Sequence, residues 1–120
     1  MMPHALVIDD SQDIRELVTV VLQGAGYSVE QAADGEKGVA CQRARPADVV
    51  ITDILMPNQN GYDMIAWLRQ HSPQVKVIAM TGGASGEMYL FAASEMGADA
   101  LLRKPFNVDQ LLRAVSDVLR

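Results

Sequence analysis

Short apolar runs alternate along the chain with segments in which apolar residues recur every three or four positions. The apolar runs lie at 5–8, 49–52, 75–80 and 100–103, and the mixed segment at 27–32 is interpreted as a further strand. Continuous runs of this length, rich in valine and isoleucine, predict strands that are buried on both faces. The other segments, at 14–22, 34–45, 64–68, 87–96 and 107–119, predict helices that each turn one apolar stripe inward.

Residues suited to helix ends flank the first and the last of these helical segments. Ser11 is placed to cap the first helix, and Gly24 or Gly26 is placed to end it. Asn107 and Gln110 form a capping-box-like pair at the start of the last helix. The chain therefore predicts five consecutive strand–helix units.

Five such units joined by short connections predict a parallel sheet, because parallel neighbours need a crossover and the helices supply it. Right-handed crossovers place these helices on both faces of the sheet. The predicted fold class is α/β, a flavodoxin-like doubly wound sheet of five parallel strands in the order 2-1-3-4-5.

Size and composition agree with one globular domain. The chain has 120 residues, of which 49% are hydrophobic, and no apolar run approaches the ~20 residues of a membrane span. The single cysteine, Cys41, cannot form an internal disulfide. A formal net charge of −5 argues against direct nucleic-acid binding. We expect a cytoplasmic protein that binds neither membrane nor nucleic acid.

Polar residues stand at four strand ends, where packing does not require them. The first strand ends in Asp9 and Asp10, the third in Asp53, the fourth in Thr81 and the fifth in Lys104. Ligands of doubly wound sheets bind beyond the carboxyl ends of the strands, near the point where the strand order reverses. We therefore expect these five side chains to converge on one site.

Three carboxylates in one partly dry pocket repel one another unless a cation neutralises them. Oxygen ligands of this kind suit Mg²⁺, with Mn²⁺ as a second possibility. A metal beside one carboxylate can orient a phosphoryl group, while Lys104 and Thr81 could bind its oxygens. Each residue alone has an ordinary explanation as a helix cap, a turn residue or a solvated side chain, so the prediction depends on all of them together.

Four segments together resemble the signature of the response-regulator receiver domain, and the resemblance covers the whole chain. The segments are Ile8-Asp9-Asp10-Ser11, Thr52-Asp53-Ile54-Leu55-Met56-Pro57, Met80-Thr81-Gly82 and Arg103-Lys104-Pro105-Phe106. Asn58 to Tyr62 also resembles the loop that follows the phospho-acceptor in this family.

The resemblance implies a role for each site residue. Asp53 would be the phospho-acceptor, and Thr81 and Lys104 would bind the phosphoryl group. Asp10, Asp53 and the Leu55 backbone carbonyl would ligate Mg²⁺ directly, with Asp9 acting mainly through water. The Lys104–Pro105 bond would be cis, which proline tolerates.

The resemblance also implies partners and an output. The phosphodonor would be a sensor histidine kinase or a histidine phosphotransfer protein. The face formed by the fourth helix, fifth strand and fifth helix would bind an unknown downstream protein or a second copy of the chain. The protein would catalyse only its own phosphorylation and dephosphorylation and is otherwise not expected to be an enzyme.

Two positions depart from the family or influence its kinetics. Leu101 replaces the tyrosine or phenylalanine that usually moves with the threonine, and we expect Tyr89 and Phe91 to pack rather than to substitute for that ring. Leu55 offers no group to align water, which predicts slow autodephosphorylation. His4, at the start of the first strand, is expected in solvent.

Three other interpretations were weighed. A degenerate receiver would bind partners without phosphorylation, but the set of five site residues is complete. A phosphoaspartate hydrolase typically has a second aspartate where this chain has Leu55. A flavodoxin needs a phosphate-binding first loop, whereas Asp9 and Asp10 would repel phosphate. We expect 1–120 to be a single receiver domain, stand-alone or excised from a longer chain, with no effector domain present.

Overall fold

The computed structural model describes residues 2–56, 59–82 and 86–120, so Pro57, Asn58 and Gly83 of the sequence motifs lie outside it. Five parallel strands form the central sheet in the order β2-β1-β3-β6-β7, which confirms the predicted order 2-1-3-4-5. These strands are β1 (His4–Ile8), β2 (Ser28–Ala32), β3 (Val49–Asp53), β6 (Lys76–Thr81) and β7 (Ala100–Arg103).

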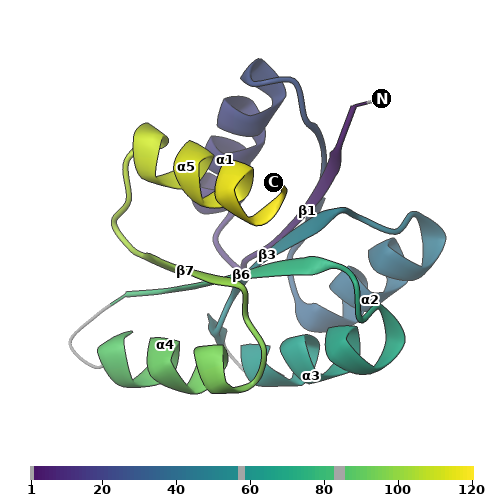
Figure 1. The fold of residues 1–120 in the computed structure, drawn as a ribbon, viewed down its shortest axis with the longest axis vertical. Coiled ribbons are helices and arrows are strands. Elements are labelled where there is room, and N and C mark those ends of the chain that lie inside the picture. Colours follow the sequence, from purple (N-terminus) through teal and green to yellow (C-terminus); the bar gives the residue numbers. More distant parts are fainter. Residues whose placement is uncertain (1, 57–58, 83–85) are drawn as a thin grey trace.

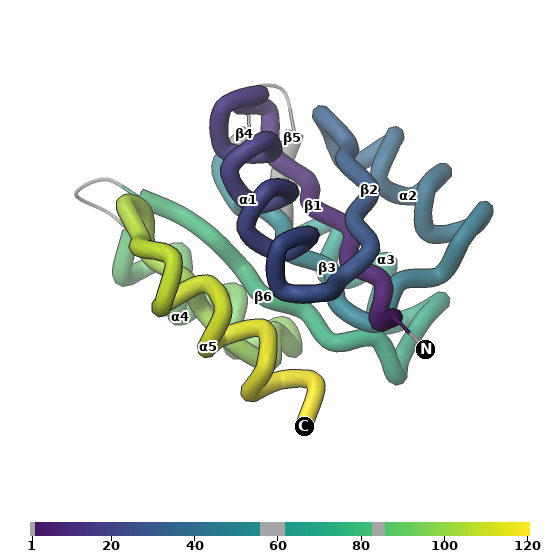
Figure 2. Tube along the Cα trace, turned by 90° about the horizontal axis from the view of Figure 1, so that it is seen from above, coloured from purple at the N-terminus to yellow at the C-terminus, as the bar shows by residue number. Residues whose placement is uncertain are grey.

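Helices cover both faces of this sheet (Figure 1). They are α1 (Gln12–Gly24), α2 (Gly35–Ala44), α3 (Gly61–His71), α4 (Gly86–Glu95) and α5 (Val108–Val118). Helices α1 and α5 lie on one face, and α2, α3 and α4 lie on the other (Figures 1 and 2). The predicted doubly wound fold is therefore present.

Each face of the sheet has its own apolar core. Leu6, Ile8 and Val50 pack with Leu68 of α3 and Leu90 of α4 on one side. Alternate residues of the same strands point the other way, and these pack against α1 and α5. The members of this second core with no exposed surface include Val7, Ile51, Val18, Leu22, Leu111 and Val115. Burial on both faces explains why these strands are continuous apolar runs.

The register of the strands brings their carboxyl ends to one edge. Ile8 of β1 lies opposite Thr52 of β3, so that Asp9 and Asp53 follow at the same level. Thr81 of β6 lies opposite Arg103 of β7, directly before Lys104. The sheet thus places all the polar strand ends on the same edge.

Helix caps fix where the flanking helices begin. The Ser11 side chain accepts a hydrogen bond from the backbone N–H of Ile14, and Asn107 and Gln110 form the predicted reciprocal capping box. Gly26 and Gly97 have φ values of 96° and 110°, which glycine adopts without strain, and both follow helix ends. The Lys104–Pro105 peptide bond is cis, as the family resemblance implied.

Two features of the described chain differ from expectation. Leu55–Met56 and Gln59–Asn60 form a short antiparallel hairpin, β4 and β5, which is too short to produce a periodic pattern in the sequence. His4 is only 5% exposed, so the prediction that it lies in solvent is wrong. Its ring contacts the Ser28 hydroxyl from Nδ1 at 2.5 Å, because the first residue of β1 lies beside β2.

No helix in the described part of the chain is long and apolar enough to cross a membrane.

Candidate functional site

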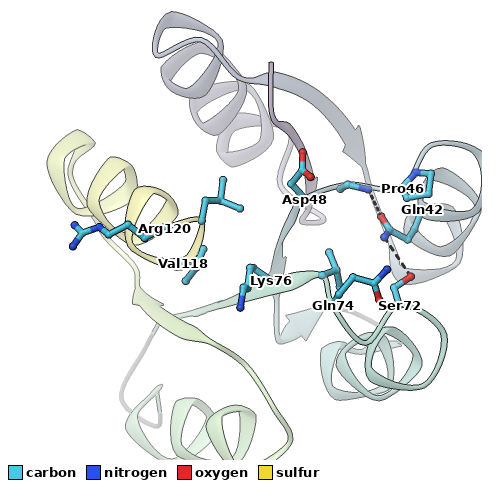
Figure 3. A pocket seen from close by; sticks show the side chains of 11 residues that line it. Gln42, Pro46, Asp48, Ser72, Gln74, Lys76, Val118 and Arg120 are labelled. Atoms are coloured by element: carbon cyan, nitrogen blue, oxygen red, sulfur yellow. Dashed lines mark hydrogen bonds between the residues drawn. The ribbon is translucent and has the colours of Figure 1, made fainter. Parts of the chain in front are cut away.

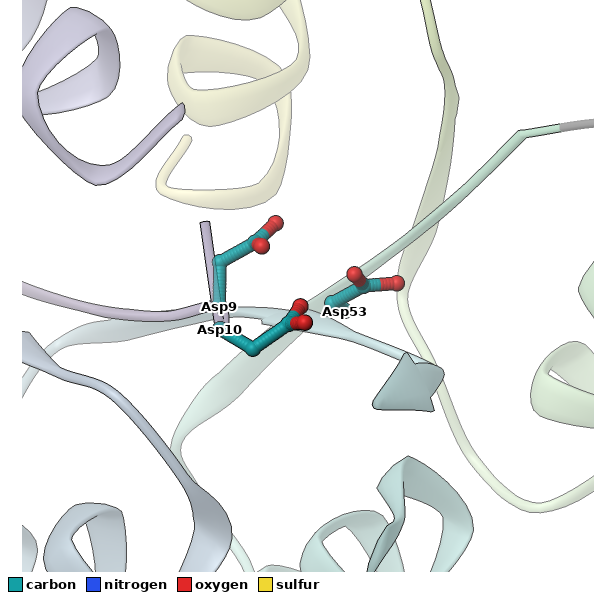
Figure 4. Close-up of side chains that lie close together, drawn as sticks. All are labelled: Asp9, Asp10 and Asp53. Carbon is teal, nitrogen blue, oxygen red and sulfur yellow. The ribbon is translucent and has the colours of Figure 1, made fainter. Parts of the chain in front are cut away.

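Three aspartates lie together at the carboxyl edge of the sheet (Figure 4). Asp9 and Asp10 follow β1, and Asp53 ends β3. Each offers a carboxylate oxygen, and these three oxygens lie within 4.8 Å of one another. Asp9 and Asp53 are buried, whereas Asp10 is exposed. The sheet therefore brings together the carboxylates that the sequence placed at separate strand ends.

Both carboxylate oxygens of Asp9 already have protein donors. Oδ1 accepts a hydrogen bond from the Ser11 backbone N–H at 2.9 Å, and Oδ2 lies 2.7 Å from the Lys104 ammonium. The Asp9 carboxylate is therefore held between a backbone amide and an ammonium. Its expected role, which is to act mainly through water, stays a prediction.

Lys104 connects the two buried aspartates. Its Nζ lies 2.7 Å from Asp9 Oδ2 and 3.0 Å from Asp53 Oδ2. The backbone N–H of Lys104 donates to the Thr81 carbonyl at 2.7 Å, which ties β7 to β6 beside the site. The second Asp53 oxygen, Oδ1, accepts from the Leu55 backbone N–H at 3.1 Å.

Burial and charge act in opposite directions on these groups. Burial raises the pKa of Asp53, and although the adjacent Lys104 lowers it, the net direction is upward with a further contribution from Asp9. Burial lowers the pKa of Lys104, but its bonds to Asp9 and Asp53 outweigh that effect and hold the pKa above its ordinary value. Lys104 is therefore a charged ammonium, and the carboxyl group of Asp53 binds a proton more tightly than an ordinary aspartate does.

Thr81 contributes a buried hydroxyl at the end of β6. The residue is 1% exposed, and its Oγ1 has no hydrogen-bond partner among the residues that the structure describes. A buried polar atom without a partner is uncommon and often marks a site where an ion, water or ligand binds. An incoming anion with oxygen acceptors would supply the missing partner.

The donor set fits a hard divalent cation. It consists of carboxylate oxygens only, with no sulfur and no imidazole, which is the ligation that Mg²⁺ prefers. Asp10 is the exposed carboxylate of the three, whereas Asp9 and Asp53 each accept a hydrogen bond on both oxygens. Asp10 and Asp53 remain the predicted direct ligands. The Leu55 carbonyl follows Asp53 by two residues and remains a predicted ligand.

A second hollow lies at the opposite end of the sheet, beside the end of α5 (Figure 3). Its buried polar group, Gln42, is already satisfied, because its Oε1 accepts from the Ala47 N–H and its Nε2 lies 3.4 Å from the Ser72 hydroxyl. The Asp48 carboxylate there accepts from the backbone N–H of His4. These groups hold loops together and leave the acidic edge as the candidate site.

The surface around Leu101 is more open than expected. Leu101 is 41% exposed in the position where the family has an aromatic ring, and Phe91 is 65% exposed on α4 beside it. The expectation that Phe91 packs is therefore wrong, because α4 turns it outward. Tyr89 is partly buried against the core, as predicted.

One residue beside the site was not anticipated. The Arg15 guanidinium donates from Nη1 to the backbone carbonyl of Asp9 at 2.8 Å and from Nε to Gln31 Oε1 at 3.3 Å. The side chain lies one turn into α1, which the Ser11 cap allows to be located from sequence. Its direction toward the Asp9 carbonyl depends on how α1 docks on the sheet, which the residue pattern alone does not show.

The parallel sheet with helices on both faces defines a doubly wound α/β domain. The aspartates at the carboxyl ends of β1 and β3 form a candidate cation site in it. Residues 5–116 match the response regulator receiver domain. The chain belongs to this family, so it is the receiver domain of a two-component response regulator.

Individual relatives agree with this assignment. The chain is 34% identical over 120 residues to RpaA of Synechocystis, a DNA-binding dual master transcriptional regulator, covering 99% of this chain and 50% of that protein. It is 27% identical over 118 residues to the response regulator SaeR of Staphylococcus aureus, covering 98% and 51%. The chain therefore spans about half the length of these curated relatives.

Solved structures give the same result. The chemotaxis protein CheY4 of Vibrio cholerae is 36% identical with a TM-score of 0.90, and the alignment covers 99% of this chain and all of that one. NtrX of Brucella abortus has a TM-score of 0.94 at 26% identity, over 99% of this chain and 27% of that chain.

Response regulators receive phosphoryl groups from histidine kinases, and their receiver domains bind Mg²⁺ at an acidic pocket. Receiver domains are signalling domains rather than typical enzymes.

Proposed function

We propose that this domain accepts a phosphoryl group from a phosphohistidine donor on Asp53, in a reaction that requires Mg²⁺, with Mn²⁺ able to substitute. The observation that carries the proposal is the pairing of Lys104 with both Asp9 and Asp53 beside the exposed Asp10. This arrangement combines a nucleophile, a cation and a set of metal ligands in one small volume.

The reaction uses Asp53 as a nucleophile. A carboxylate oxygen of Asp53 attacks phosphorus, the bond between phosphorus and the donor imidazole nitrogen breaks, and the electron pair of that bond stays with the imidazole. Bound Mg²⁺ would supply charge neutralisation and orientation for the phosphoryl group. Asp10, Asp53 and the Leu55 carbonyl would hold the ion, and Asp9 would act through water.

Two side chains would bind the transferred group. Lys104, now 3.0 Å from Asp53 Oδ2, would remain close enough to pair with a phosphoryl oxygen on that carboxylate. The Thr81 hydroxyl, which lacks a partner among the described residues, would donate to a second oxygen. The phosphorylated site would then satisfy a group that the resting site leaves unpaired.

The output surface would be the face formed by α4, β7 and α5. Met88, Phe91, Leu101 and Val108 are large apolar residues there that are at least 41% exposed, which suits binding of a downstream protein or a second copy of the chain. We propose that residues 1–120 act as a single receiver domain, whether alone or within a longer chain.

Intact mass after incubation with acetyl phosphate and Mg²⁺ tests the assignment. We expect one phosphoryl adduct on the wild type, none on Asp53→Asn, and none on the wild type in EDTA. Asp109→Asn, at an exposed position in the first turn of α5, is the matched control and should be modified like the wild type. A wild type that neither binds Mg²⁺ nor forms an adduct with any donor would instead indicate a degenerate receiver.

A further inference from the structure

Arg15 contacts the chain segment that carries two of the three site aspartates. Its Nη1 donates to the Asp9 backbone carbonyl at 2.8 Å, and its Nε donates to Gln31 on β2 at 3.3 Å. The side chain is partly buried and begins one turn into α1, where its own backbone N–H donates to the Ser11 carbonyl. The guanidinium therefore spans from α1 to β2 across the segment that follows β1.

The carbonyl that Arg15 holds belongs to the same planar peptide unit as the N–H of Asp10. Fixing the direction of that carbonyl fixes the plane of the unit and hence the position of the Asp10 Cα. Asp9 itself is held on other sides, because its N–H donates to the Ala32 carbonyl and its Oδ1 accepts from Ser11. The Asp10 side chain is exposed, and none of the described residues holds it by a hydrogen bond.

We infer that Arg15 is a positioning residue for the metal site, which directs the Asp10 carboxylate toward Asp53 by fixing the Asp9–Asp10 peptide unit. The inference rests on the proposed function, in which Asp10 is a direct ligand of Mg²⁺. Groups that orient metal ligands contribute substantially to metal affinity although they never touch the ion. Arg15 would thus set how tightly Mg²⁺ binds and would leave the transfer step unchanged once the ion is bound.

The positive charge of Arg15 has the opposite effect on affinity, since a nearby cation repels Mg²⁺. The two effects can be separated with salt, because ions screen the charge over about 10 Å at 0.1 M and only about 4 Å near 0.5 M, while the geometry of a hydrogen bond is unaffected. The decisive variant is Arg15→Met, which keeps an unbranched side chain and removes both the donors and the charge. Arg15→Lys keeps the charge and one donor but loses the planar fork that reaches two acceptors.

Mg²⁺ affinity is measured by isothermal titration calorimetry at about 0.1 M and 0.5 M KCl, and phosphorylation by acetyl phosphate is followed by intact mass. For Arg15→Met we expect affinity to fall on the order of tenfold at the higher salt concentration, with a smaller loss at the lower one. Arg15→Lys should recover part of the loss. At saturating Mg²⁺ the initial phosphorylation rate of both variants should stay close to that of the wild type. Arg113→Lys, at an exposed position on α5, is the control and should change neither quantity.

The outcomes distinguish this inference from the proposed function. If Arg15→Met binds Mg²⁺ as tightly as the wild type at the higher salt concentration and is phosphorylated normally, the positioning role is refuted and the proposed function stands. A reduced rate at saturating Mg²⁺ would also refute it, since Arg15 would then act on the transfer itself. If the wild type binds no Mg²⁺ and forms no adduct, the proposed function fails regardless of Arg15.

Discussion

The acidic site should make the metal-free domain less stable than it could be, and Asp53→Asn should reveal this. The substitution removes one buried negative charge and keeps the shape of the side chain. Its carbonyl oxygen can still accept from the Leu55 N–H, as Asp53 Oδ1 does now. We expect Asp53→Asn to raise the free energy of unfolding in EDTA.

The magnitude follows from the distances in the site. At an effective dielectric constant of about 20, like charges no more than 4.8 Å apart repel by at least about 3.5 kcal/mol, and this applies to Asp53 with buried Asp9. Exposure of Asp10 reduces its repulsion to about half of that value. The attraction of Asp53 to Lys104 at 3.0 Å is worth about 5.5 kcal/mol on the same scale. These charge terms nearly cancel. The cost of burying the carboxylate therefore decides whether Asp53→Asn raises or lowers the free energy of unfolding.

Burial is also the largest cause of the raised pKa of Asp53. A carboxyl group whose pKa is higher in the folded state than in the unfolded state binds protons more tightly when folded. The stability that this proton provides is complete below the unfolded pKa and is lost as pH rises through the folded pKa. At neutral pH the charged Asp53 therefore costs stability, and we expect Asp53→Asn to recover stability on the usual scale of one substitution, about 1 kcal/mol.

Urea unfolding followed by far-UV circular dichroism tests this in EDTA and in saturating Mg²⁺. With a urea dependence of ~1–3 kcal/mol per molar, 1 kcal/mol shifts the midpoint by roughly 0.5 M. Mg²⁺ at 100 times its dissociation constant should stabilise the wild type by about 2.7 kcal/mol and the variant by much less, so the order of stability reverses. Asp109→Asn should not show this reversal. A midpoint for Asp53→Asn that is clearly below the wild type in EDTA would falsify the reasoning.

Four further predictions follow from individual contacts. Because the pKa of Asp53 is raised, protons should compete with Mg²⁺, so calorimetry should find weaker binding near pH 5 than near pH 7.5; equal affinity at both would contradict this. Gly38→Val should destabilise the fold by about 1–3 kcal/mol in urea, because a Cβ at Gly38 would lie 2.6 Å from Ile8 Cδ1; an unchanged midpoint would count against that clash. Arg69→Ala should cost about 2–3 kcal/mol, since its guanidinium donates to three backbone carbonyls and one carboxylate, and a loss below ~0.5 kcal/mol would show these bonds to be unimportant. Leu55→Asn should shorten the phosphoryl lifetime severalfold in a mass time course by offering water a partner, and an unaltered lifetime would remove Leu55 from that role.

Most of the fold could be predicted because the determinants are local. Burial on both faces forces continuous apolar runs on the inner strands β1, β3 and β6. The crossover rule then leaves few topologies for five strand–helix units. The convergence of Asp9, Asp53 and Lys104 followed from the same rule, since parallel strands place their carboxyl ends at one edge. The structure confirms that these side chains lie together.

The features that were missed depend on contacts between elements. His4 was taken for a solvated terminal residue, but its place opposite Ser28 in the register buries it. Phe91 faces outward because α4 docks by Leu90 and Ala93, and a helix this apolar on all sides does not show which stripe is buried. Arg15 reaches the Asp9 carbonyl only because α1 packs at a particular angle. Such angles and registers are set by tertiary packing and have no signature in the sequence.

The unpaired hydroxyl of Thr81 has a consequence for how signal and target influence each other. The Thr81 hydroxyl has no hydrogen-bond partner among the described residues. Burying a hydroxyl without a partner costs about 1–3 kcal/mol, and a phosphoryl oxygen that accepts from Thr81 would recover energy on that scale. Coupled equilibria of this kind are reciprocal: a target protein that favours the state in which Thr81 is bonded raises the equilibrium constant for phosphorylation by the same factor by which phosphorylation raises the affinity for the target. On this energy scale the factor is about 5 to 150. The downstream target would therefore behave as an effector of its own activating signal, and the extent of phosphorylation at a fixed donor concentration would rise when the target is present.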